Sequence, residues 1–118
     1  MEKRTVACIA VLFSCLQFAW AQTAFDRKLE SLYRNSVATI TASELSALMN
    51  SGTPVVLFDI RSAEEYGISH IRTANFLDYS SFNTRMVDKF KKDSPIIVYC
   101  SVGYRSERVG EKLKSAGF

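Results

Sequence analysis

The chain has 118 residues, of which 47% are apolar and 23% charged, so it can form one folded domain and is neither disordered nor collagen-like. Its formal charge of +3 is too small to indicate a nucleic-acid partner, and we expect none.

Residues 1–21 follow the order of a secretory signal peptide. Two cations precede an uncharged, apolar stretch, and Ala19-Trp20-Ala21 supplies small residues around a cleavage site. The apolar stretch is shorter than the roughly 20 residues that cross a bilayer as a helix. We therefore predict an exported protein, periplasmic or secreted, with no membrane partner after cleavage. A buried helix, an uncleaved anchor and a lipoprotein signal acylated at Cys15 are the alternatives, and bulky Phe13 disfavours the last.

The remaining chain is expected to form an N-terminal helix and linker over residues 22–36 and one domain over residues 37–118. Short apolar runs predict strands at 37–40, 55–58, 74–77 and 96–99, and helical spacing predicts helices over 23–33, 41–50, 62–66, 80–92 and 106–116. The fourth of these helices would place Phe82, Met86 and Phe90 in the core. Alternating strands and helices predict an α/β domain whose parallel sheet is flanked by helices.

Once residues 1–21 are removed, one cysteine remains, Cys100, at the carboxyl end of the strand at 96–99. Ligands of open α/β sheets bind at that end of the strands. The helix expected from Ser106 would present amide donors and a positive dipole end, which stabilise a thiolate. Gly103 lets the intervening loop curl, and Arg105 adds a permanent cation. The pattern indicates a reactive sulfur anion, or an anionic substrate held over one; an inert buried cysteine is the alternative.

Residues 100–106, CSVGYRS, resemble the C-x-x-G-x-R-S active-site loop of single-domain rhodaneses, which are sulfurtransferases. Two further segments agree in the same order. Residues 58–66, FDIRSAEEY, resemble the family's D-x-R-x-x-x-E-[YF] stretch, and residues 69–75, SHIRTAN, resemble its G-H-I-P-G-A segment. The resemblance covers about residues 37–118. The loop is one residue shorter than the C-x5-R loop of related phosphatases, which favours sulfur transfer over phosphoryl transfer.

The resemblance implies a rhodanese-like fold and a two-step covalent transfer without a metal or organic cofactor. Cys100 would take a sulfane sulfur from a small anionic donor such as thiosulfate and pass it to a thiol or to cyanide. The loop that binds the persulfide would comprise Ser101, Val102, Gly103, Tyr104 and Arg105. A binding or sulfur-sensing module without turnover is the alternative, although such a module need not keep a cysteine, a glycine and an arginine together.

Four further residues are expected near the site in structural roles: Asp59, Arg61, His70 and Ser106. The first two would form hydrogen bonds or an ion pair near the end of the sheet, and the histidine follows the D-x-R strand. With one cysteine and one histidine after residue 21, a zinc site is not expected.

The chain departs from the family pattern after its last predicted helix. The family continues into one more strand, which lies between its first strand and the strand that carries the cysteine. We therefore expect a C-terminally incomplete domain, a fragment rather than a degenerate gene product, in which segment 37–40 has no direct partner.

Overall fold

A computed structural model of the protein describes residues 22–118. The signal peptide expected at 1–21 and the alternative lipid attachment at Cys15 lie outside the described residues. The chain divides into two compact units, Met1–Tyr33 and Arg34–Phe118, and in the first unit a helix occupies residues 22–32. Within residues 22–118, no helix is both long enough and apolar enough to cross a membrane.

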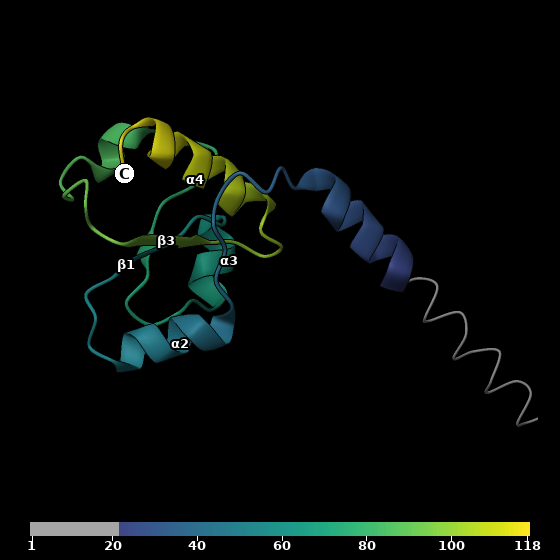
Figure 1. The fold of residues 1–118 in the computed structure, drawn as a ribbon, viewed down its shortest axis with the longest axis horizontal. Helices are drawn as coiled ribbons and strands as arrows, with labels where there is room; N and C mark the ends of the chain where they lie inside the picture. The colour runs from purple at the N-terminus through teal and green to yellow at the C-terminus, as the bar shows by residue number, and fades with distance from the viewer. Residues whose placement is uncertain (1–21) are drawn as a thin grey trace, which may run out of the picture. The chain divides into compact units, whose positions relative to one another are not determined.

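The second unit is built on a three-stranded parallel sheet (Figure 1). Its strands are β1 (Val56–Asp59), β2 (Asn75–Phe76) and β3 (Ile96–Tyr99), in the order β2-β1-β3. Along the β1–β3 pair, each residue from Val56 to Asp59 is aligned with the corresponding residue from Ile96 to Tyr99. The parallel α/β fold is therefore confirmed, and β1 is the central strand because it pairs with β2 on one side and β3 on the other.

Helices α2 (Ala42–Asn50) and α4 (Tyr104–Ser115) lie on opposite faces of this sheet (Figure 1). The α4 face is packed by Val109 and Leu113 of the helix against alternate strand residues, Phe58, Ile96 and Val98. The α2 face is packed by Leu45 and Met49 against Leu57, Ile97 and Tyr99. Because successive strand side chains point to opposite faces, each apolar run supplies both halves of the core.

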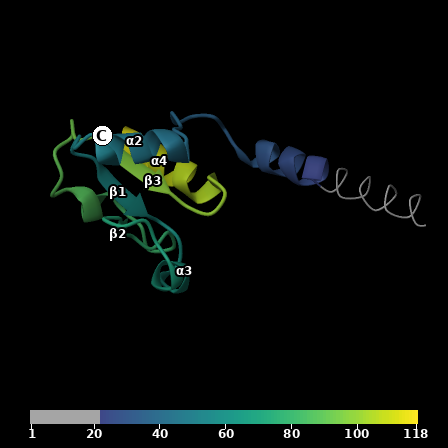
Figure 2. The ribbon, with the colours of Figure 1, turned by 90° about the horizontal axis from the view of Figure 1, so that it is seen from below.

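Two capping boxes set the starts of α2 and α3 (Ala63–Ile68). At α3 the Ser62 hydroxyl accepts a hydrogen bond from the amide of Glu65, and the Glu65 carboxylate accepts one from the amide of Ser62. Thr41 and Glu44 repeat this arrangement at α2. These reciprocal bonds satisfy amides that have no partner within the helix. Figure 2 shows α3 beyond the end of β1, where its first turn reaches the end of the sheet that carries Cys100.

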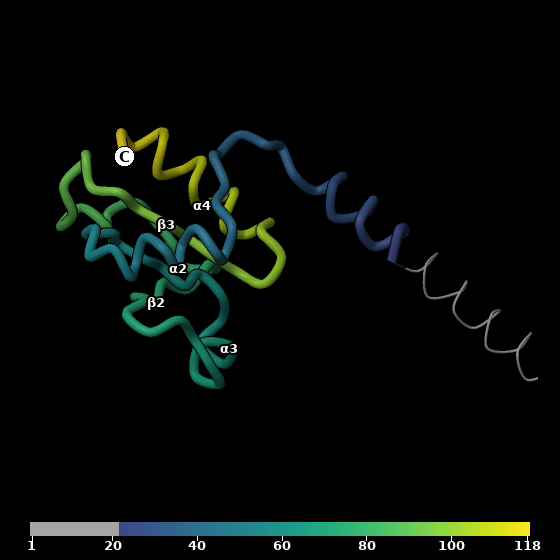
Figure 3. Tube along the Cα trace, turned by 60° about the horizontal axis from the view of Figure 1, so that its bottom comes forward, coloured from purple at the N-terminus to yellow at the C-terminus, as the bar shows by residue number. Residues whose placement is uncertain are grey.

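The strand predicted at 37–40 is wrong, since this segment forms no strand. It instead follows a stretch bound to α4, because the amides of Arg34 and Ser36 donate hydrogen bonds to the Glu107 carboxylate (Figure 3). Val37 packs closely on Gly110 of α4. A Cβ atom added to Gly110 would lie only 3.0 Å from Cγ1 of Val37. A strand needs a neighbouring backbone to bond with, and the three-stranded sheet places none beside this segment.

The helix predicted over 80–92 is also wrong, because only a short 3-10 helix, η1 (Thr84–Val87), forms there. The Asn83 side chain accepts a hydrogen bond from the amide of Arg85, and such local bonds compete with a regular helix. The apolar residues divide accordingly. Val87 is fully buried, whereas Met86, which was expected in the core, is 38% exposed.

Candidate active site

Cys100 follows β3 directly, at the carboxyl end of the sheet, as the sequence predicts. Its side chain belongs to the same face as Ile96 and Val98, under α4, while Tyr99 points to the α2 face. The thiol is partly exposed. Strand alternation thus directs the sulfur toward the beginning of α4 and not toward the opposite face of the sheet.

The loop after Cys100 aims hydrogen-bond donors at its sulfur. The amide of Gly103 donates to Sγ at 3.1 Å, and the Ser106 hydroxyl oxygen lies 3.7 Å from Sγ and donates to the Gly103 carbonyl at 2.8 Å. Gly103 has φ of +89°, a left-handed conformation that favours glycine, and it is the N-cap of α4. This turn starts α4 at Tyr104, two residues earlier than predicted, so the sulfur lies at the N-terminus of a twelve-residue helix.

The pKa of the Cys100 thiol results from two opposing effects. Burial raises it, but hydrogen bonds from the amide and hydroxyl of Ser106 and from the amides of Val102 and Gly103 lower it further than burial raises it. The net pKa is below the ordinary value for cysteine. Because the thiolate is the nucleophilic form, the loop increases the reactive fraction at neutral pH.

Arg105 is held by an acidic partner that the sequence analysis did not identify as a site residue. Its two terminal nitrogens, Nη1 and Nη2, donate to the Glu65 carboxylate at 3.0 and 3.2 Å, and Nη2 also donates to Ser101 Oγ at 3.1 Å. The Ser101 hydroxyl donates to the same carboxylate at 2.7 Å. The loop is therefore tied to the first turn of α3. The sequence carried two signals for Glu65, its capping-box spacing from Ser62 and its place as the glutamate of the D-x-R-x-x-x-E-[YF] stretch, but neither pointed to Arg105 as its partner.

Asp59 and Arg61 form a buried ion pair at the end of β1. The carboxylate of Asp59, with no exposed surface, accepts hydrogen bonds from the Arg61 guanidinium at 2.7 Å and from the Tyr99 hydroxyl at 2.6 Å. Burial raises the pKa of Asp59, yet these bonds bring it below the usual value. The Tyr99 hydroxyl in turn accepts the amide of Ile71 at 3.1 Å. The network joins the segment after α3 to the sheet.

Comparison with known proteins agrees with this geometry. Residues 41–118 match the family described as Rhodanese-like domain. The chain belongs to that family. It is 34% identical over 82 residues to the probable adenylyltransferase/sulfurtransferase MoeZ of Mycobacterium tuberculosis H37Rv, covering 69% of this chain and 21% of MoeZ. It is 31% identical over 64 residues to the thiosulfate sulfurtransferase GlpE of Coxiella burnetii RSA 493, covering 54% of this chain and 59% of GlpE. The match thus spans about a fifth of MoeZ and less than two thirds of GlpE.

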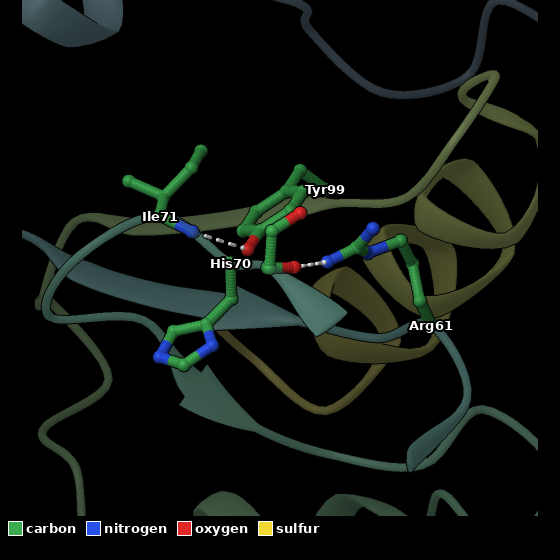
Figure 4. Close-up of a pocket in the computed structure, with 5 residues that line it drawn as sticks. Arg61, His70, Ile71 and Tyr99 are labelled. Carbon is green, nitrogen blue, oxygen red and sulfur yellow. Dashed lines mark hydrogen bonds between the residues drawn. The ribbon is translucent and has the colours of Figure 1, made fainter. Parts of the chain in front are cut away.

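An open pocket of the rhodanese-like domain lies on the Tyr99 side of the sheet (Figure 4). It is lined by Arg61, Ser69, His70, Ile71 and Tyr99. His70 stacks on Tyr66 with 3.8 Å between ring centroids, and its Nδ1 lies 2.9 Å from the Tyr66 carbonyl oxygen. Figure 4 shows the imidazole turned away from Arg61. The structure therefore groups His70 with the end of α3 and not with Cys100.

Over residues 22–118, the rhodanese-like domain shows no group of three or more histidine, cysteine, aspartate or glutamate side chains placed to hold a metal ion. Of the predicted site residues, the structure brings together Cys100, Gly103, Arg105 and Ser106 with the other residues of the loop. Asp59, Arg61 and His70 lie in the neighbouring network.

Proposed function

We propose that this protein is a sulfurtransferase that carries a sulfane sulfur on Cys100. The observation that carries the proposal is the 3.1 Å hydrogen bond from the Gly103 amide to Sγ at the N-terminus of α4. The same amides that stabilise a thiolate suit the terminal sulfur of a persulfide, because that sulfur is also anionic. Membership of the rhodanese-like family supports this chemistry over that of an inert cysteine.

The proposed reaction has two displacement steps. The Cys100 thiolate attacks the sulfane sulfur of thiosulfate, the S–S bond of the donor breaks, and sulfite leaves with the bonding electron pair. An acceptor thiolate or cyanide then attacks the outer sulfur of the persulfide, and the Sγ–S bond breaks to return the Cys100 thiolate. Donor and acceptor react in turn on one sulfur atom, so ping-pong kinetics are expected.

Thiosulfate is the proposed donor because the loop presents backbone dipoles to a small anion. A thiol or cyanide is the proposed acceptor because either can displace the outer sulfur. Export to the periplasm or beyond the cell is proposed on the pattern of residues 1–21. Asp59, Arg61 and His70 would support the site from the neighbouring network without touching the reacting sulfur.

The test is to treat the full chain with thiosulfate and measure the mass of the peptide that contains Cys100. One additional sulfur atom on this peptide, removed again by cyanide, is expected in the wild type and not in Cys100→Ala. Thiocyanate formation should likewise require Cys100. Equal activity in both proteins, or no sulfur on Cys100 at saturating thiosulfate, would refute the proposal that the protein is a sulfurtransferase. The alternative, a binding or sulfur-sensing module without turnover, would then remain.

A further inference from the structure

The guanidinium of Arg105 is the cation closest in sequence to Cys100, and its charge is matched by Glu65. The two groups form a bidentate ion pair with N–O distances of 3.0 and 3.2 Å. Glu65 also accepts hydrogen bonds from the Ser101 hydroxyl and the Ser62 amide. With four donors on one carboxylate, the pair has a fixed geometry, and an approaching donor molecule meets a pair with no net charge.

Two other arginines near this end of the sheet, Arg61 and Arg108, are also paired. Arg61 is bound to the buried carboxylate of Asp59, in the network on the opposite side of the sheet from the thiol. Arg108, one turn into α4, lies 3.5 Å from Glu107 and 3.2 Å from Glu111. The charges of Arg105, Arg61 and Arg108 are thus matched by carboxylates, and the amide dipoles of the loop add an attraction for an anion that needs no unmatched cation.

Part of the rim of the loop is apolar, although Ser101 is also exposed there. Val102 is 43% exposed and Tyr104 is 37% exposed, one on each side of Gly103. An apolar rim gains little from a small inorganic dianion, whereas it can contact the carbon atoms of an organic sulfur compound. The neutralised charge of Arg105 and the apolar side chains of the loop thus both favour an organic sulfur donor of low charge.

We propose that Glu65 is a positioning residue that, through Arg105, sets the charge selectivity of Cys100. By neutralising the guanidinium it lets singly charged or neutral organic sulfane donors, such as thiosulfonates and protonated persulfides, compete with inorganic dianions. This inference rests on the proposed role of Cys100 as the nucleophile. With a protonated persulfide, the thiolate attacks the outer sulfur, the S–S bond breaks, and the organic thiolate leaves with the electron pair.

The charge at the thiol can be measured without turnover by alkylating Cys100 in the full chain with iodoacetate or iodoacetamide. Both reagents lose iodide to the same thiolate and differ by one negative charge, so their rate ratio reports the local electrostatic potential. Peptide mass spectrometry separates Cys100 from Cys8 and Cys15. In Glu65→Gln the unmatched guanidinium should raise the iodoacetate/iodoacetamide ratio about fivefold at low salt.

Two further variants separate charge from structure. Glu64→Gln removes the same charge from the neighbouring position of α3 and should change the ratio less than about twofold. In the double variant Glu65→Gln/Arg105→Gln both charges are gone, and the ratio should return close to the wild-type value. If Glu65 only held the loop in place, Glu65→Gln would slow both reagents together and leave the ratio unchanged, which would overturn the proposal.

A measurement on the wild type covers the case in which these variants fold poorly. Because the guanidinium is matched, the ratio should change less than about twofold between about 20 mM and 200 mM salt. A steep fall in the ratio with salt would show an unmatched cation and contradict the proposal.

Sulfur donors then test selectivity directly. Methanethiosulfonate differs from thiosulfate in having a methyl group in place of one oxyanion. Glu65→Gln should shift the kcat/KM ratio toward thiosulfate, again by about fivefold at low salt. Transfer from neither donor to wild-type Cys100 would contradict the proposed function, whereas an unchanged alkylation ratio would contradict the role of Glu65 alone.

Discussion

Replacing Ser106 by alanine is expected to raise the pKa of the Cys100 thiol. The Ser106 hydroxyl has one proton, which it donates to the Gly103 carbonyl at 2.8 Å, while its oxygen lies 3.7 Å from Sγ. Beside a neutral thiol, this arrangement lets the S–H group donate to the hydroxyl oxygen. When the thiol ionises, the hydroxyl can turn its proton to the sulfur and give up the carbonyl. The alanine variant keeps the Ser106 amide, so only the contribution of the hydroxyl to the lowered pKa of Cys100 is removed.

The size of the effect follows from comparing the two bonds. A hydrogen bond to a charged acceptor contributes about 1.5–3 kcal/mol, and the neutral bond given up contributes about 0.5–1.5 kcal/mol. The hydroxyl therefore stabilises the thiolate by about 1 kcal/mol. At a pH below the thiol pKa, its loss lowers the thiolate fraction about fivefold.

The assay is the rate of iodoacetamide alkylation of Cys100 as a function of pH, followed on its peptide. The midpoint of the profile should move to higher pH in Ser106→Ala, while the plateau rate at high pH stays within about twofold. Ser115→Ala, the same change at the exposed far end of α4, is the matched control and should reproduce the wild-type profile. A midpoint at or below the wild-type value would refute the reasoning that the hydroxyl favours the thiolate.

Three further predictions concern the stability of the domain. Tyr99→Phe removes a 2.6 Å hydrogen bond to the buried Asp59 carboxylate, so chemical denaturation should show a loss of about 1.5–3 kcal/mol. Gly103→Ala forces an alanine to φ of +89°, which should cost about 1–2 kcal/mol and slow Cys100 alkylation. The pKa of Glu65 is lowered to about 2, chiefly by Arg105, so its stabilising effect is present above its ordinary pKa and is lost as pH falls toward 2. The difference in unfolding free energy between wild type and Glu65→Gln should shrink over that range.

Each of these predictions has a matched control. Tyr79→Phe, at a half-buried tyrosine, should alter the unfolding free energy by less than about 0.5 kcal/mol. Gly67→Ala, in open space within α3, should be neutral or stabilising. Asp93→Asn, at an exposed acid outside the ion pair, should lack the pH dependence that is assigned to Glu65 and Arg105. A Tyr99→Phe protein as stable as the wild type would contradict the structural role of the Asp59 network.

Features set by neighbouring residues could be predicted from the sequence. The apolar run at 96–99 became β3 with the same bounds, because four consecutive apolar residues after a proline suit a strand buried on both faces. The capping serine at position 62 likewise begins α3. The loop that carries Cys100 was also recognisable, since its spacing places a glycine and an arginine at a helix start.

Two elements that depend on competition for backbone hydrogen bonds were mispredicted. The segment at 37–40 has strand-forming residues, but its surroundings are tied to Glu107 of α4 and no strand lies beside it. The helix expected over 80–92 shortened to η1 because side chains took up the local amides. Both outcomes depend on competition for backbone hydrogen bonds, which local pattern does not reveal.

The sequence by itself determined the class of fold, the order of the strands along the chain and the identity of the nucleophile candidate, because these depend on residue type and spacing. Only the tertiary structure decided how the charge of Arg105 is used. Its partner Glu65 lies 40 residues earlier, at the start of α3, and reaches the loop because parallel β1 and β3 end at the same edge of the sheet. Whether a cation attracts a substrate or is already matched depends on distances between elements, and those distances exist only in the folded chain.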